Sequence, residues 1–87
     1  MPSMTKSVFS ARYDLFRQEL VTARIAARLT QTDLAAKLSR PQSFVSKFER
    51  GERRLDVIEF LEVAEALEID PIHFIRKVVH DRKPRRR

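Results

Sequence analysis

The sequence has no cysteine, a single glycine and no long apolar run among its 87 residues. Without cysteine, the chain can form neither a disulfide nor a thiolate metal site. A membrane-spanning helix needs about eighteen consecutive apolar residues, and no segment approaches that length. The first ten residues, MPSMTKSVFS, also lack the apolar stretch of a secretory signal. We therefore expect one soluble domain in a reducing, cytoplasmic compartment, with no membrane partner.

Residues suited to catalysis are not grouped in the sequence. The two histidines, His73 and His80, are two helical turns or about 10.5 Å apart, too far to share a metal ion. There is no glycine-rich phosphate loop, and no serine has a recognisable base and orienting acid around it. The sequence therefore predicts no enzyme activity, no cofactor and no metal site.

The formal net charge of +6 is unevenly distributed along the chain. Residues 1–55 contain eleven Lys and Arg against five Asp and Glu, whereas residues 56–70 contain six acids and no base. Residues 71–87 are basic again, with seven Lys and Arg and one Asp. A chain polarised in this way orients in the field of a polyanion with its acidic segment turned away. The alternative is that these are solvated helix faces that only confer solubility.

Apolar residues recur at helical spacing almost everywhere, which predicts an all-α domain of five short helices. The first three are expected at about 11–28, 31–38 and 41–50. The fourth follows Asp56 and the fifth follows Asp70-Pro71, a cap and a first-turn proline. Residues 1–10 are expected to form an N-terminal arm, residues 11–81 the domain, and residues 82–87 a disordered basic tail.

Local signals define several helix ends. Thr30 to Asp33 and Asp56 to Glu59 are both typical of capping boxes. Between the second and third helices only Ser39 and Arg40 remain to turn the chain before Pro41. Two short helices joined by so short a turn are the layout of a helix-turn-helix, whose second helix enters the DNA major groove.

Arg24 lies close to the apolar stripe of the first helix, where a guanidinium is costly unless it is paired. Glu49, one residue after Phe48, is the best placed acid, and a pair would join the first helix to the end of the third. The alternative is that Arg24 extends to water.

The segments LTQTDLAAKL, QSFVSKFERG and LEVAEALEIDP together resemble the Cro and phage-repressor type of helix-turn-helix domain, a compact lambda-repressor-like fold. The resemblance covers about fifty residues and implies a bacterial DNA-binding regulator on the nucleoid, with double-stranded DNA as partner. It implies that Gln42, Ser43 and Lys47 meet base edges, with Ser46 on the same face. It also implies that Gln31 and Thr32, which open the second helix, contact a phosphate. In relatives the positions of Arg24 and Glu49 often form an ion pair.

The chain departs from this family pattern at several positions. Relatives often have glycine where this chain has Arg28, Ser39 and Glu68, so three helix ends are expected to close without it. Phe44 occupies a position that is often small and polar. It either extends the core towards Phe48 or contacts a thymine methyl group.

Gly51, the only glycine, is expected to end the third helix in a left-handed turn. Cations lie just before this helix in the sequence, at its end and just after it, where they would contact phosphates without reading the base sequence. These predicted phosphate contacts are Arg40, Arg50, Arg53 and Arg54. The alternative is a solvated loop.

The fifth helix has more apolar residues than one packing face needs, which favours a two-fold homodimer. The predicted interface is Ile72, Phe74, Ile75, Val78 and Val79. The competing interpretation is that the monomer's own core buries both sides.

For function, the alternative to a regulator is an antitoxin of the same fold, which binds a toxin protein and represses its own operon. A further alternative is an interaction module that has lost DNA binding.

Overall fold

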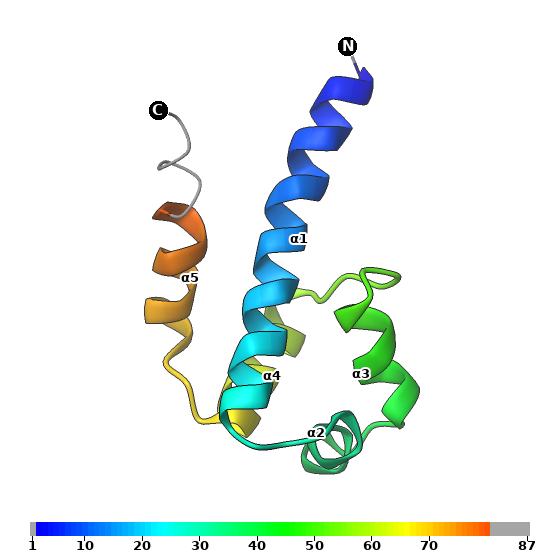
Figure 1. The fold of residues 1–87 in the computed structure, drawn as a ribbon, viewed down its shortest axis with the longest axis vertical. Coiled ribbons are helices and arrows are strands. Elements are labelled where there is room, and N and C mark those ends of the chain that lie inside the picture. The colour runs from blue at the N-terminus through cyan, green and yellow to red at the C-terminus, as the bar shows by residue number, and fades with distance from the viewer. Residues whose placement is uncertain (1, 81–87) are drawn as a thin grey trace.

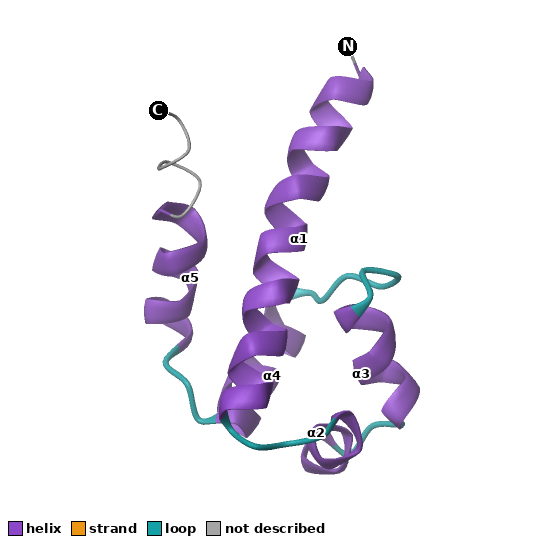
Figure 2. Ribbon diagram, in the orientation of Figure 1, coloured by secondary structure: helices purple, strands orange, loops and turns teal. Residues whose placement is uncertain are grey.

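The structure is a computed structural model that describes residues 2–80, and over this range it forms five helices and no strand. They are α1 (Pro2–Ala26), α2 (Gln31–Leu38), α3 (Gln42–Glu49), α4 (Val57–Leu67) and α5 (Pro71–His80). Figure 1 shows α5 running beside α1, with α2 and α3 on the opposite side of α1. Short loops connect the helices (Figure 2). The predicted five-helix all-α fold is confirmed, and the predicted basic tail at 82–87 lies outside the described residues.

The first helix begins well before its predicted start at residue 11. It runs from Pro2 to Ala26, so residues 2–10 of the expected N-terminal arm are helical and continuous with the rest of α1. Proline suits the first turn of a helix, and no glycine or further proline interrupts the chain before Ala26.

The core is built from the inner faces of the helices. Among the described residues, the largest side chains that are almost fully buried are Leu20, Leu34, Val45, Phe48 and Val63. They come from α1, α2, α3 and α4, so each of these four helices contributes one apolar face, as its periodicity predicts. Burial of these faces fixes the position of α3 relative to the other helices.

An aromatic cluster connects α1, α4 and α5. The ring of Phe16 lies 5.4 Å from that of Phe60 and 5.8 Å from that of Phe74, measured between centroids. Phe60 and Phe74 are 5.6 Å apart. Tilted and edge-to-face contacts at these distances add to the stability gained from burial. The cluster attaches α5 to the domain.

Both predicted capping boxes are present. The Thr30 hydroxyl accepts from the Asp33 N–H, and the Asp33 carboxylate accepts from the Thr30 N–H. Asp56 and Glu59 make the same reciprocal pair at the start of α4. These contacts satisfy N–H groups that a helix N-terminus otherwise leaves without partners.

Three helices end on non-glycine residues in the left-handed region. Arg28, Ser39 and Glu68 have φ values of 63°, 56° and 60°. At Ser39 the cap is followed by a bond from the Arg40 N–H to the Ala35 carbonyl, at 3.0 Å. The helix-turn-helix is therefore closed without the glycine that such a turn favours.

Residues 2–80 contain no helix that is long and apolar enough to cross a membrane. Within the same described range, no group of three or more His, Asp or Glu side chains could hold a metal ion.

Candidate nucleic-acid interface

The outer face of α3 is polar, and its inner face is buried. Gln42, Ser43 and Lys47 are exposed, and Ser46 is half-buried. The Ser46 hydroxyl donates to the Ser43 carbonyl at 3.4 Å, within the helix. Because Val45 and Phe48 are held in the core on the other side of α3, these four polar residues face outward together.

The structure brings Arg24 and Glu49 together in a nearly buried ion pair. Arg24 Nε donates to Glu49 Oε2 at 2.7 Å, and Nη2 donates to Oε1 at 3.1 Å. The third guanidinium nitrogen, Nη1, donates to the Leu29 carbonyl at 2.8 Å. The side chains are 13% and 5% exposed, so this two-pronged pair fastens α1 to the end of α3 in a largely water-free site.

Glu49 also begins a chain of side-chain hydrogen bonds that reaches the surface. Gln31 Nε2 donates to Glu49 Oε1 at 2.9 Å, and Gln42 Nε2 donates to Gln31 Oε1 at 2.8 Å. A carboxylate can only accept, so Gln31 must turn its amide nitrogen inward and its oxygen towards Gln42. Gln42 then retains its own oxygen and one N–H for an external partner.

Arg17 also holds the end of α3 in place, a role that was not predicted from the sequence. Its Nη1 donates to the Glu49 backbone carbonyl at 2.7 Å, and its Nε donates to Asp14 at 3.1 Å. Arg17 therefore caps the C-terminus of α3. Arg17 lies seven residues before Arg24, which places both on one face of α1. From this spacing the sequence could have indicated that Arg17 also faces the end of α3.

Gly51 adopts the expected left-handed conformation after α3, with φ 82°. A Cβ atom at this position would lie 3.0 Å from Arg17 Nε. Glycine is thus required both by the backbone conformation and by the close approach of the arginine.

Two of the arginines predicted to contact phosphates, Arg50 and Arg53, are held in two-pronged ion pairs. Arg50 donates to both carboxylate oxygens of Glu52 at 2.9 Å. Arg53 donates to both oxygens of Glu59 at 2.9 and 2.8 Å. The Arg50–Glu52 pair forms within the α3–α4 connection, whereas the Arg53–Glu59 pair joins that connection to the first turn of α4.

The other two predicted phosphate contacts, Arg40 and Arg54, differ from each other. Arg40 lies 3.3 Å from Glu62 and 3.7 Å from Glu59. Arg54 lies over the Tyr13 ring, 4.6 Å from its centroid, and has no carboxylate partner among the described residues. Of the four, Arg54 alone keeps a charge that no acid of the described chain balances.

Phe44 extends the core instead of pointing into solvent. Its ring meets that of Phe48 edge-on, with centroids 5.7 Å apart. The guanidiniums of Arg40 and Arg53 lie over the Phe44 ring at 4.5 and 4.8 Å. These contacts favour the core interpretation over a thymine contact, because cations cover the ring.

Glu59, in the first turn of α4, is the acid that faces Arg40 and Arg53, the two arginines that cover Phe44. Hydrogen bonds from Arg53, together with the Asp56 N–H, lower the pKa of Glu59 to about 2 from 4.5. Hydrogen bonds of this kind favour the ionised carboxylate. Glu59 therefore carries a full negative charge at physiological pH, directly beside the predicted DNA-contacting surface.

The predicted dimer residues of α5 divide into two groups. Phe74 and Val78 are buried in the core of the domain itself, so these two are not available on its surface. Ile72, Ile75 and Val79 remain 63%, 39% and 48% exposed. Their spacing places them in one row along α5.

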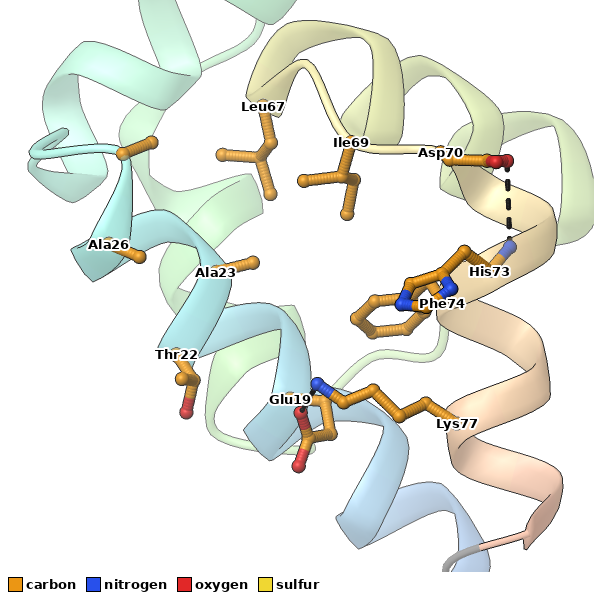
Figure 3. Close-up of a pocket in the computed structure, with 11 residues that line it drawn as sticks. Glu19, Thr22, Ala23, Ala26, Leu67, Ile69, Asp70, His73, Phe74 and Lys77 are labelled. Atoms are coloured by element: carbon orange, nitrogen blue, oxygen red, sulfur yellow. Dashed lines mark hydrogen bonds and ion pairs between the residues drawn. The ribbon is translucent and has the colours of Figure 1, made fainter.

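A groove of about 420 Å³ lies between α1 and α5. Figure 3 shows Lys77 reaching across it to Glu19, and their charged atoms are 3.2 Å apart. Asp70 accepts from the N–H groups of Ile72 and His73 at the start of α5. The groove lies on the α1-facing flank of α5, and the exposed aliphatic row lies elsewhere on that helix.

Comparison with known proteins agrees with this arrangement. Residues 20–74 match the Helix-turn-helix family, and this range contains the whole of α2, α3 and α4. A solved structure, the "XRE-family like protein from Pseudomonas syringae pv. tomato str. DC3000", is 47% identical with a TM-score of 0.86. That match covers 90% of this chain and 95% of the other. No curated protein matches the chain. The resemblance seen in the sequence is thereby confirmed, and the chain belongs to the XRE family of Cro/C1-type helix-turn-helix DNA-binding regulators.

Proposed function

We propose that this regulator reads DNA sequence by placing α3 in the major groove. The observation that carries the proposal is the hydrogen-bonded chain from buried Glu49 through Gln31 to exposed Gln42. A side chain held in one orientation before binding loses less conformational freedom when it meets its target. Among the described residues, Gln42 is thus the best prepared to read a base.

Each outward side chain of α3 has a chemical preference. Gln42 retains one N–H and its oxygen, the pair of groups that adenine N7 and N6 require. Lys47 is exposed and has no ion-pair partner in the described chain, so its ammonium is available for guanine O6 and N7. Ser43 and Ser46 add short hydroxyl contacts to bases or backbone.

Phosphate contacts would position the domain on the duplex. The second amide N–H of Gln31 and the exposed side chain of Thr32 lie at the N-terminus of α2, where the helix dipole favours an anion. Arg54 supplies a cation after α3. These contacts fix orientation and register, and the α3 side chains supply selectivity.

We also propose that two copies associate through the exposed row Ile72, Ile75 and Val79. An isologous dimer through α5 would place two recognition helices about 34 Å apart, one turn of DNA, and its operator would be a near-palindrome. Ile75→Glu should therefore shift the protein from dimer to monomer in sedimentation velocity. Ile25→Glu, at an exposed isoleucine of α1, is the control and should leave the dimer unchanged. A monomeric wild type would contradict this arrangement.

Selection of bound duplexes from a random library at physiological salt tests the function directly. The expected result is a near-palindrome with half-sites one helical turn apart. Binding without any enrichment would contradict base reading, and would favour the antitoxin or interaction-module alternatives. In that case a toxin protein that copurifies with the chain would favour the antitoxin alternative.

The enriched duplex then allows the base-reading residues to be tested. Gln42→Ala and Lys47→Ala should each weaken binding by about 1–3 kcal/mol and relax preference at one base pair. Lys37→Ala is the matched control, because Lys37 is an exposed lysine of α2 on the side that faces α4. Equal losses on every duplex for Lys47→Ala would show that Lys47 contacts the backbone only.

A further inference from the structure

The two arginines that directly follow α3 are balanced by acids of the same chain. Each guanidinium presents one edge to a carboxylate, Arg50 to Glu52 at 2.9 Å and Arg53 to Glu59 at 2.9 and 2.8 Å. A two-pronged pair of this kind occupies the same donors that a phosphate would use. Both pairs lie where the chain leaves the proposed recognition helix.

We propose that Glu52 and Glu59 limit the sequence-independent part of this protein's DNA affinity by neutralising Arg50 and Arg53. The inference rests on the proposed placement of α3 in the major groove. An arginine that meets a phosphate with an unbalanced charge adds about 0.9 to the slope of log K against log salt. An arginine that keeps a carboxylate partner brings almost no net charge to the duplex and releases few counterions.

The two pairs differ in how firmly they are held. Glu59 accepts from the Asp56 N–H as well as from Arg53, and the Arg53 guanidinium also lies over Phe44. The pKa of Glu59 is about 2, so this acid remains charged under all physiological conditions. Arg50 and Glu52 are both more than half exposed and make no further side-chain contact of this kind. Glu52 is therefore the residue whose charge can be removed with the least effect on the fold.

The consequence is that phosphate contacts contribute less to DNA binding, and base contacts contribute relatively more. With Arg50 and Arg53 neutralised, Lys47 in α3 and Arg54 in the connection after it are cations that no acid of the described chain balances. Random DNA, which offers only phosphates, is then held weakly. A correct operator gains the base contacts of α3 in addition, so those contacts form a larger share of the total affinity.

The test compares the full chain with Glu52→Gln, Glu59→Gln and a matched control, Glu65→Gln. All three substitutions remove one negative charge, but Glu65 is exposed on α4 and has no ion pair among the described residues. Binding to a random-sequence duplex and to the library-selected duplex is measured by fluorescence anisotropy between 50 and 200 mM salt, roughly the range over which backbone contacts change affinity most.

We expect Glu52→Gln to bind random duplex more tightly than wild type and to steepen the salt slope by about 0.9. Over a fourfold change in salt, that slope corresponds to an additional loss of about 3.5-fold. Glu59→Gln should act in the same direction, whereas Glu65→Gln should match the wild-type slope. Thermal melts monitored by circular dichroism show whether Glu59→Gln remains folded. If Glu59→Gln is unfolded, the salt slope of Glu52→Gln alone tests the inference.

Equal slopes for Glu52→Gln, Glu65→Gln and wild type would overturn the inference. If wild type still selects an operator in that case, only this inference fails and the proposed function stands. If the library yields no enriched duplex and neither wild type nor Glu52→Gln binds the random duplex, both the inference and the proposed function are wrong.

Discussion

Arg24→Ala removes the partner of the most deeply buried carboxylate in the described chain. Wild-type Glu49 is 5% exposed and accepts two bonds from Arg24 and one from Gln31. After the substitution only the Gln31 amide faces the carboxylate, and the Leu29 carbonyl also loses its donor. A charge that water solvates in the unfolded chain is then left almost alone in the folded one.

The expected loss is large relative to the stability of the whole domain. Breaking a buried ion pair by removing one partner costs about 3–5 kcal/mol. A chain of 87 residues has a total stability of about 4–13 kcal/mol, at about 0.05–0.15 kcal/mol per residue. Arg24→Ala should therefore be marginally folded, or unfolded, at room temperature.

Urea unfolding followed by circular dichroism measures the effect. Arg12→Ala, at an exposed arginine of α1 with no ion-pair partner among the described residues, is the control and should change stability by less than about 0.5 kcal/mol. The double variant Arg24→Leu, Glu49→Leu should recover most of the loss, because a buried pair replaced by apolar residues is often neutral. A loss below about 1 kcal/mol for Arg24→Ala would refute the reasoning, since it would mean that water already solvates Glu49.

Three further predictions concern acid sensitivity and helix ends. The pKa of Glu59 is lowered to about 2 from 4.5, so its contribution to stability is complete above pH 4.5 and is lost as pH falls towards 2. Thermal melts at pH 5 and pH 3 should differ less in Glu59→Gln than in Glu65→Gln, and equal differences would exclude this role. Glu68→Gly should raise the unfolding free energy by about 0.5–1 kcal/mol, because φ is 60° there, whereas Glu65→Gly inside α4 should lower it by about 1 kcal/mol. Gly51→Ala should lower it by about 1–2 kcal/mol, since φ is 82° and the new Cβ would lie 3.0 Å from Arg17 Nε; an unchanged urea midpoint would show that the turn relaxes.

Structure that depends on neighbours in the chain was readable from the sequence. The capping boxes at Thr30 and Asp56 each join residues three apart, so local spacing determines them. The two-residue turn at Ser39 and Arg40 likewise follows from how few residues separate two apolar periodicities. The partner of Arg24 could be inferred because a nearly buried guanidinium needs an acid, and few acids lie beside an apolar stripe.

Only the tertiary structure decided which polar groups are already occupied. The sequence shows Arg50 and Arg53 as cations after a helix, but their engagement with Glu52 and Glu59 depends on the path of the α3–α4 connection. The bond between Gln31 and Gln42 depends on how α2 packs against α3.

The same limit applies to α5. Its sequence shows five apolar residues, yet the position of Phe16 and Phe60 determines that Phe74 enters the core. Ile72 and Ile75 stay on the surface for the same reason. Helical periodicity assigns residues to faces of one helix, whereas the angles and distances between helices determine which face is covered. The sequence by itself therefore determined the helices and the motif, and helix packing determined which side chains remain free to bind DNA or a second copy.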